Sequence, residues 1–308
     1  MTRNSGRLIT PIRVPVRPRQ GCWPRWLEQR APRFFWADPG VVADPDVTPE
    51  RFRSAMSAFA IGDTIKITGV GRHPAADRLL LDNLDVSKAC ILDVGASDGS
   101  TSMDLIEQMS TFAKYVIADL YLYVFLVTVG RRRCFYSPHG ECFLVTGPRM
   151  IAWPSQSAWI RLCYSWLLRR AARLQREQVL LVNPTARARA AADARVSFAV
   201  HDVFTPWAGD RPDVIKVANL LRRDYFPDDR LRMGVTALLT SLAEGGHLLL
   251  VNNPRIKGVP CAAALYRRQA ARFVRVAATD YLPDVDDLVQ AATLPVIAVP
   301  ASRSQRER

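Results

Sequence analysis

The stretch that decides the fold is Ile91-Leu92-Asp93-Val94-Gly95-Ala96-Ser97-Asp98-Gly99-Ser100. It is an apolar run long enough for one strand, followed by a turn of small residues and a helical pattern over residues 100–109. Glycine at 95 and 99 permits positive φ and leaves the backbone bare for a close approach, and the helix start offers unpaired N–H groups to a ligand. The stretch therefore predicts a strand–turn–helix unit that binds a cofactor.

This unit resembles the first motif of the class I S-adenosylmethionine-dependent methyltransferases, in which an acidic residue, an apolar residue and spaced glycines follow the first strand. Asp93, Val94, Gly95 and Gly99 match that motif, and Ser97 replaces its middle glycine. Serine there argues against the dinucleotide fingerprint Gly-x-Gly-x-x-Gly, because a pyrophosphate needs bare backbone at that position. The resemblance implies S-adenosyl-L-methionine as cofactor. It places around the cofactor Asp93, Gly95, Ala96, Ser97 and Gly99.

Short apolar runs alternate with helical patterns along the rest of the chain. We expect strands at residues 90–94, 114–119, 196–201, 213–218, 246–251, 273–278 and 294–299. Helices are expected at residues 100–109, 227–243 and 261–272. This order predicts an α/β fold with a Rossmann-like, mostly parallel seven-stranded sheet and helices on both faces.

The domain organisation is predicted from breaks in this alternation. Residues 1–47 are rich in Arg and Pro and are interpreted as an extension without a continuous packed core, after which Thr48 caps a helix that begins at Pro49. Residues 48–300 make the methyltransferase-like domain, and residues 301–308 a basic tail. Residues 120–179 interrupt the pattern as an insertion after the second strand.

The insertion contains two apolar segments of different character. Residues 120–129 are too short to span a bilayer, so we expect a buried strand or helix there. Residues 159–173 combine Trp and Leu with several arginines. That pattern fits a membrane surface, a cover over the substrate pocket, or packing against the sheet.

Two further acids lie where the family needs them. Asp119 ends the second strand, where a carboxylate accepts hydrogen bonds from both ribose hydroxyls. Asp202 ends the third strand, where the resemblance implies an acid that receives the adenine amino group while Val203 and Phe204 hold the ring. An aspartate after a strand is also often only a cap or turn residue, and that interpretation stays open for both.

The segment after the fourth strand resembles the chemotaxis-receptor methyltransferases, which share its Asn-apolar-Leu step, here Asn219-Leu220-Leu221, and a Tyr-Phe shortly beyond. Asn219 thereby joins the cofactor-binding candidates. The chain has no counterpart of their helical N-terminal domain, so their protein-glutamate substrate is not carried over.

Methyl transfer from a sulfonium is an in-line displacement that mainly needs alignment and exclusion of water. A hydroxyl or protonated amine acceptor also needs a base. The catalytic candidates near the carboxyl ends of the strands are Asn219, which would orient, and Asp224, Tyr225 and His139.

The remaining motifs give weaker indications of function. Cys134, His139 and Cys142 suggest zinc, but no fourth ligand has suitable spacing, so no metal is expected. Asn183-Pro184-Thr185 is not the Asn-Pro-Pro-aromatic motif of amino-directed nucleic-acid methyltransferases. The six cysteines form no Cys-x-x-Cys pair, which favours reduced thiols and a cytoplasmic protein.

The net charge of +13 attracts nucleic acid, an anionic membrane surface or an acidic substrate, and does not choose among them. No transmembrane segment is expected, while peripheral membrane contact fits the charge. Three function classes stay open. They are a methyltransferase acting on a small molecule or biosynthetic intermediate, which the motifs favour, a nucleic-acid-directed enzyme of the same fold, and a non-catalytic partner protein.

Overall fold

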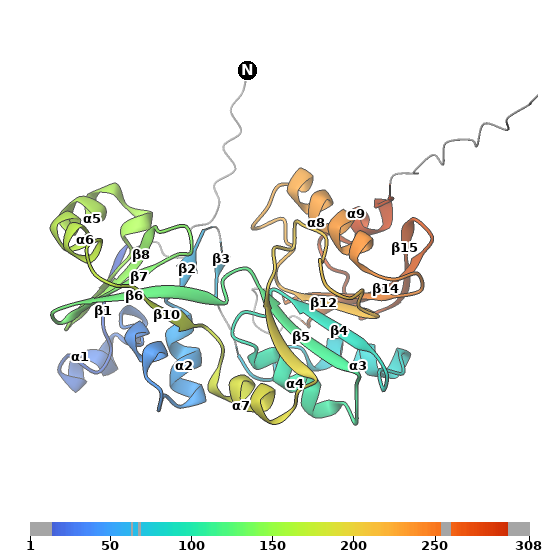
Figure 1. Cartoon of the computed structure of the whole chain (residues 1–308), viewed down its shortest axis with the longest axis horizontal. Helices are drawn as coiled ribbons and strands as arrows, with labels where there is room; N and C mark the ends of the chain where they lie inside the picture. The colour runs from blue at the N-terminus through green and yellow to red at the C-terminus, as the bar shows by residue number, and fades with distance from the viewer. Residues whose placement is uncertain (1–13, 63, 67–68, 254–259, 295–308) are drawn as a thin grey trace, which may run out of the picture.

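Two β-sheets organise the chain into two lobes (Figure 1). The computed structural model describes residues 14–62, 64–66, 69–253 and 260–294. The larger sheet has seven strands in the order β11–β5–β4–β12–β13–β14–β15. Its strands are β4 (Cys90–Val94), β5 (Lys114–Asp119), β11 (Val196–Val200), β12 (Val214–Ala218), β13 (His247–Asn252), β14 (Ala262–Gln269) and β15 (Arg272–Ala278). The first five in this order pair in parallel and the last two pair antiparallel, which confirms the predicted α/β fold.

Helices cover both faces of this sheet because successive side chains of its central strands are buried on opposite faces. In β4, Ile91 packs in one core with Leu80 and Leu105, whereas its neighbour Leu92 packs in another with Leu231. The first face carries α3 (Pro74–Asn83), α4 (Ser100–Gln108) and α7 (Pro184–Ala192). The second carries α8 (Asp228–Ser241) and α9 (Asp286–Ala291).

One predicted helix is wrong. Residues 261–272 contain the whole of β14, the turn after it and the first residue of β15, although their alanines favour a helix. Helix propensity is a weak preference, and here pairing with β13 on one side and β15 on the other satisfies the backbone of the strand. The expected strand at residues 294–299 lies outside the described residues except for Leu294.

The second lobe is built on a six-stranded antiparallel sheet in the order β1–β9–β8–β7–β6–β10. Its strands are β1 (Val16–Pro18), β6 (Tyr123–Val129), β7 (Arg132–Tyr136), β8 (Cys142–Thr146), β9 (Met150–Ala152) and β10 (Glu177–Leu180). β6 confirms the expected buried segment at residues 120–129. β1 comes from the predicted extension, which is therefore not separate from the insertion: Val16 pairs with Ala152.

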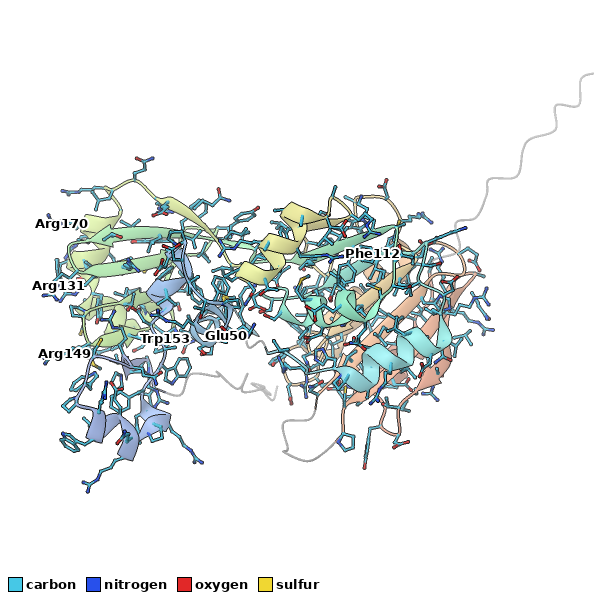
Figure 2. The ribbon with its side chains drawn as sticks, turned by 90° about the horizontal axis from the view of Figure 1, so that it is seen from below. Glu50, Phe112, Arg131, Arg149, Trp153 and Arg170 are labelled. Atoms are coloured by element: carbon cyan, nitrogen blue, oxygen red, sulfur yellow. The ribbon has the colours of Figure 1, made fainter. Side chains whose placement is uncertain are left out.

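The N-terminal residues also supply the core of this lobe. Thr48 caps α2 (Pro49–Met56), as predicted, by accepting a hydrogen bond from the Arg51 N–H at 3.4 Å. The indole N–H of the fully buried Trp153 donates to the Ala58 carbonyl at 2.8 Å (Figure 2 labels this tryptophan). The remaining elements are α1 (Arg25–Arg30), η1 (Pro32–Phe34), η2 (Pro39–Ala43), β2 (Ala60–Ile61), β3 (Thr64–Ile65), η3 (Pro154–Gln156), α5 (Ala158–Cys163) and α6 (Ser165–Ala171).

The segment at residues 159–173 lies on the second lobe, over the face of its sheet opposite α2 (Figure 1). Leu167 and Ala171 of α6 are fully buried against the sheet, which confirms packing as the role of these two residues. No residue between 122 and 200, all of which the structure describes, lines the cavity described below, so the segment does not cover it. Among the described residues, no helix has the length and apolar character needed to cross a bilayer.

Candidate functional site

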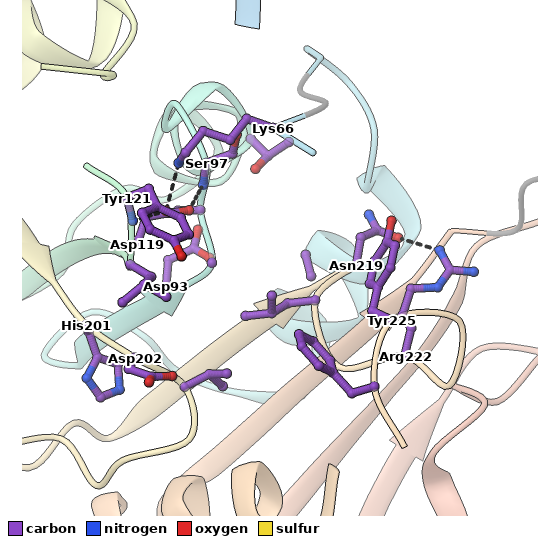
Figure 3. A pocket seen from close by; sticks show the side chains of 18 of the residues that line it. Lys66, Asp93, Ser97, Asp119, Tyr121, His201, Asp202, Asn219, Arg222 and Tyr225 are labelled. Carbon is purple, nitrogen blue, oxygen red and sulfur yellow. Dashed lines mark hydrogen bonds and ion pairs between the residues drawn. The ribbon is translucent and has the colours of Figure 1, made fainter. Parts of the chain in front are cut away.

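A cavity of about 420 Å³ opens at the carboxyl edge of the seven-stranded sheet (Figure 3). The strands that follow β4 in the chain, β5 and β11, lie on one side of β4, whereas β12 and the later strands lie on its other side. The switch point, at which the strand order reverses, therefore lies between the neighbours β4 and β12. Ligands of open α/β sheets bind at such a point. The volume is within the usual range of small-molecule pockets, about 300–1,000 Å³.

The turn after β4 forms one wall of the cavity. Gly95 and Ser97 both have positive φ, at 72° and 59°, so the serine adopts the left-handed conformation that glycine takes freely. Ala96 lines the cavity with them. A Cβ at Gly95 would lie 2.6 Å from the Leu220 side chain, so this glycine makes room for packing as well as for the turn.

Of the motif residues assigned to the cofactor, which are Asp93, Gly95, Ala96, Ser97 and Gly99, only Gly99 does not line the cavity. It caps α4 with a φ of 79°, and a Cβ there would lie 3.2 Å from the Cβ of Ala186 on α7. Its position is explained by helix packing.

Asp93, on β4, also lines the cavity. It is only 1% exposed, and its carboxylate accepts hydrogen bonds from the Ser102 hydroxyl at 2.8 Å and the Tyr115 hydroxyl at 2.9 Å. Burial raises the pKa of Asp93, with the nearby Lys216 ammonium opposing the shift. Asp93 therefore links β4 to α4 and β5 through hydrogen bonds.

Asp119 lies where β5 ends, and its carboxylate is already well supplied with donors. One oxygen accepts from the Lys66 ammonium at 2.7 Å and the Tyr121 N–H at 2.9 Å, and the other accepts from the Ser97 N–H at 2.9 Å. A carboxylate has about four acceptor positions, so one remains for a ligand. Lys66 comes from the segment after β3 and was not identified in the sequence.

Asp202, Val203 and Phe204 line the cavity together beyond the end of β11. One Asp202 oxygen accepts from the Phe204 N–H at 3.0 Å, so the aspartate does form a turn, and its other oxygen makes no hydrogen bond that is seen within the described chain. The Arg230 guanidinium stacks 4.2 Å from the centre of the Phe204 ring. Asp202 can therefore be both a turn residue and a ligand contact.

Asn219 follows β12 with a positive φ of 58° and connects three loops. Its side-chain oxygen accepts from the Asn253 N–H at 2.6 Å, and its amide nitrogen lies 2.9 Å from Nε2 of His73. Burial, with the Lys216 and Arg72 charges, lowers the pKa of His73 to about 3, so the ring is neutral at pH 7. Because Nε2 then accepts from the amide, the proton is assigned to Nδ1, which is buried without a partner among the described residues.

Of the other catalytic candidates, only one lines the cavity. Tyr225 lines the cavity (Figure 3), whereas Asp224 does not and lies 3.7 Å from the Arg222 guanidinium. His139 is exposed on the turn between β7 and β8, in the other sheet, so the structure does not bring it to the carboxyl edge as expected. The reason is that residues 120–179 contribute their strands to the second sheet and not to the larger one.

Several lining residues were not among the site residues predicted from the sequence. They are Lys66, Arg72, His73, Tyr121, His201, Leu220, Arg222, Phe226, Arg230 and Asn253. Asn253 directly follows β13, as Asn219 follows β12, so the same signal was available for it. Arg72 and His73 precede Pro74, a helix-start signal that places them at no particular edge of the sheet. Burial lowers the pKa of Arg72.

No protein-family model and no curated protein sequence matches the chain. Among solved structures, similar ones include the N-methyltransferase NodS from Bradyrhizobium japonicum WM9, crystallised with S-adenosyl-L-homocysteine, at 18% identity and a TM-score of 0.29. The match covers 58% of this chain and 59% of NodS.

Another similar structure is CalS10, an amino pentose methyltransferase from Micromonospora echinaspora with bound S-adenosylmethionine, at 17% identity and a TM-score of 0.29. That match covers 63% of this chain and 60% of CalS10. The chain thus spans less than two thirds of either neighbour. The local likeness to chemotaxis-receptor methyltransferases stays a prediction.

Proposed function

We propose that the chain is an S-adenosylmethionine-dependent methyltransferase acting on a small molecule or biosynthetic intermediate. The observation that carries the proposal is the convergence, in one cavity at the switch point, of the Gly95–Ser97 turn, Asp119 and the segment from Asp202 to Phe204. These are the residues that the motif resemblance assigns to the cofactor, and three separate strand ends bring them together.

The residues present fit an adenosyl group. The Ser97 hydroxyl lines the cavity and is buried without a hydrogen-bond partner among the described residues, so it is available to a ligand. Val203 and Phe204 offer an apolar surface to a planar ring, and Asp202 offers a carboxylate beside it. Asp119 has one acceptor position left for a ribose hydroxyl rather than the two expected, because Lys66 shares this carboxylate.

When bound, the cofactor supplies an electrophilic methyl group on sulfur. The chain's own contribution is to hold the two reactants in line and exclude water. We assign Tyr225 to the acceptor side, because it lines the cavity at the end near Asn219 and away from Asp202 (Figure 3). Asn219 orients the loops through its bonds to Asn253 and His73.

The test is calorimetric titration of the full chain with S-adenosylmethionine and S-adenosylhomocysteine. Asp202→Ala is expected to weaken both affinities about tenfold or more, since a charge-assisted hydrogen bond contributes about 1.5–3 kcal/mol. Asp210→Ala is the matched control, because Asp210 lies in the same loop region and its side chain is 86% exposed. Binding by neither ligand to folded wild-type protein would favour the non-catalytic alternative.

A further inference from the structure

The outer surface of α5 and α6 combines exposed apolar side chains with arginines. We call it the α5–α6 surface and define it by Trp159, Arg161, Leu162, Trp166, Arg169, Arg170, Arg173 and Leu174. Trp159 is 69% exposed, Leu162 63% and Trp166 52%. Single exposed apolar residues are ordinary, whereas a group of them on one pair of helices indicates a contact surface.

Packing within the lobe does not account for these side chains. α5 buries none of its residues, and α6 buries only Leu167 and Ala171 against the sheet. The tryptophans are also not needed for the cavity, which no residue of this surface lines. Folding and the proposed methyl transfer therefore leave the surface unexplained.

The chain segment that carries the surface has charge of one sign. Residues 142–176 contain six arginines and no aspartate or glutamate. The Arg132 guanidinium lies 5.6 Å from the centre of the Trp166 ring, so cationic and aromatic groups are interleaved. Figure 2 shows Arg131, Arg149 and Arg170 along the outer end of this lobe, far from Phe112 in the other lobe.

We propose that the α5–α6 surface binds an anionic lipid bilayer, with both helices lying in its headgroup region. Tryptophan is favoured at membrane interfaces, where its ring is half apolar and its N–H is wet. Arginines beside it reach lipid phosphates, each strengthening binding about fivefold near an anionic leaflet. The exposed leucines favour lipid over nucleic acid, whose phosphates and bases offer little to an aliphatic side chain. The inference does not depend on the proposed methyl transfer.

The experiment is cosedimentation of the full chain with vesicles of pure phosphatidylcholine and of equal parts phosphatidylcholine and phosphatidylglycerol. Binding is expected only to the anionic vesicles. Arg169→Glu with Arg170→Glu should weaken it at least twentyfold. The control carries the same charge change on the other lobe, at Arg211→Glu with Arg232→Glu, whose side chains are exposed, and should bind within about threefold of wild type.

Tryptophan fluorescence reports insertion. A blue shift on adding anionic vesicles is expected to disappear in Trp159→Ser with Trp166→Ser, and to persist in Trp26→Ser, which removes another exposed tryptophan, 61% exposed on α1. The proposal is overturned by equal loss in both arginine pairs, since that would show only the net charge. It is also overturned if the chain does not bind anionic vesicles but binds an RNA oligonucleotide, and the substitutions of Arg169 and Arg170 weaken that RNA binding.

Discussion

Replacing Asp119 by asparagine tests whether the Lys66–Asp119 ion pair is structural, ligand-binding or both. The two side chains are 5% and 11% exposed, and their charged atoms lie 2.7 Å apart. Removing one partner of a buried pair leaves the other charge uncompensated, at a cost of about 3–5 kcal/mol. Domains are stable by only about 5–15 kcal/mol, so Asp119→Asn should shift the urea unfolding midpoint clearly downward.

The partner substitution should cost less. In Lys66→Met the carboxylate keeps the Ser97 and Tyr121 N–H donors, so we expect a loss of about 1–3 kcal/mol. The double variant should recover much of the loss of Asp119→Asn, because neither charge is then left unpaired. Additive effects of the two substitutions would refute the pairing.

Calorimetry on the same variants separates the two roles of the aspartate. If Asp119 holds a ribose hydroxyl, Lys66→Met should retain S-adenosylhomocysteine binding, while the double variant should bind weakly despite its recovered stability. Full binding by the double variant would limit Asp119 to a structural role. Asp119→Ala is a poorer choice because it also removes the acceptor of two backbone N–H groups.

Three other substitutions are predicted to have separable effects. Gly95→Ala should lower the unfolding free energy by about 1–3 kcal/mol in urea titration, because its Cβ would meet Leu220 at 2.6 Å and its φ is 72°; an unchanged midpoint would contradict this. The pKa of His73 is about 3 when folded, below its unfolded value of about 6.5, so its contribution to stability is full above pH 6.5 and is lost as the pH falls toward 3. Wild type should lose stability over that range more steeply than His73→Asn, and parallel pH curves would exclude His73 as a cause. Tyr225→Phe should leave S-adenosylhomocysteine affinity within about twofold and lower turnover about 100-fold or more once an acceptor is found; weakened cofactor affinity instead would move Tyr225 to the cofactor side.

The larger sheet was predictable because its signals are local. Most strand and helix ends agree within two residues, for instance α8 at Asp228–Ser241 against the expected residues 227–243. The strand β14 was not predictable in this way. Its alanine-rich sequence has no strong alternation, and only its two neighbours in the sheet decide its conformation.

The second sheet was not fully predictable because its two outer strands, β1 and β10, pair with partners distant in sequence, whereas β6 to β9 pair as successive neighbours. β1 pairs with β9 across more than a hundred residues, as in Val16 with Ala152, and a composition rich in Arg and Pro gives no sign of such a partner. Lys66 was missed for a similar reason, because its partner Asp119 is 53 residues away in the sequence. No motif distinguishes this lysine from a surface lysine. Asp119, which ends β5, and Asn219, which directly follows β12, were predictable because parallel strands bring their carboxyl ends to one edge.

The position of Asp119 joins these two parts of the structure. It ends β5 of the larger sheet, and β6 of the second sheet begins at Tyr123, so the chain passes from one lobe to the other beside the cavity. Lys66, which follows the β2–β3 pair, donates a hydrogen bond to the same carboxylate. Ile61 of β2 and Gly62 in the turn after it also line the cavity. A ligand that donates a hydrogen bond to Asp119 must therefore share this carboxylate with the residues that connect the lobes. For this reason the stability of the lobe junction and the affinity for the cofactor should be measured on the same variants.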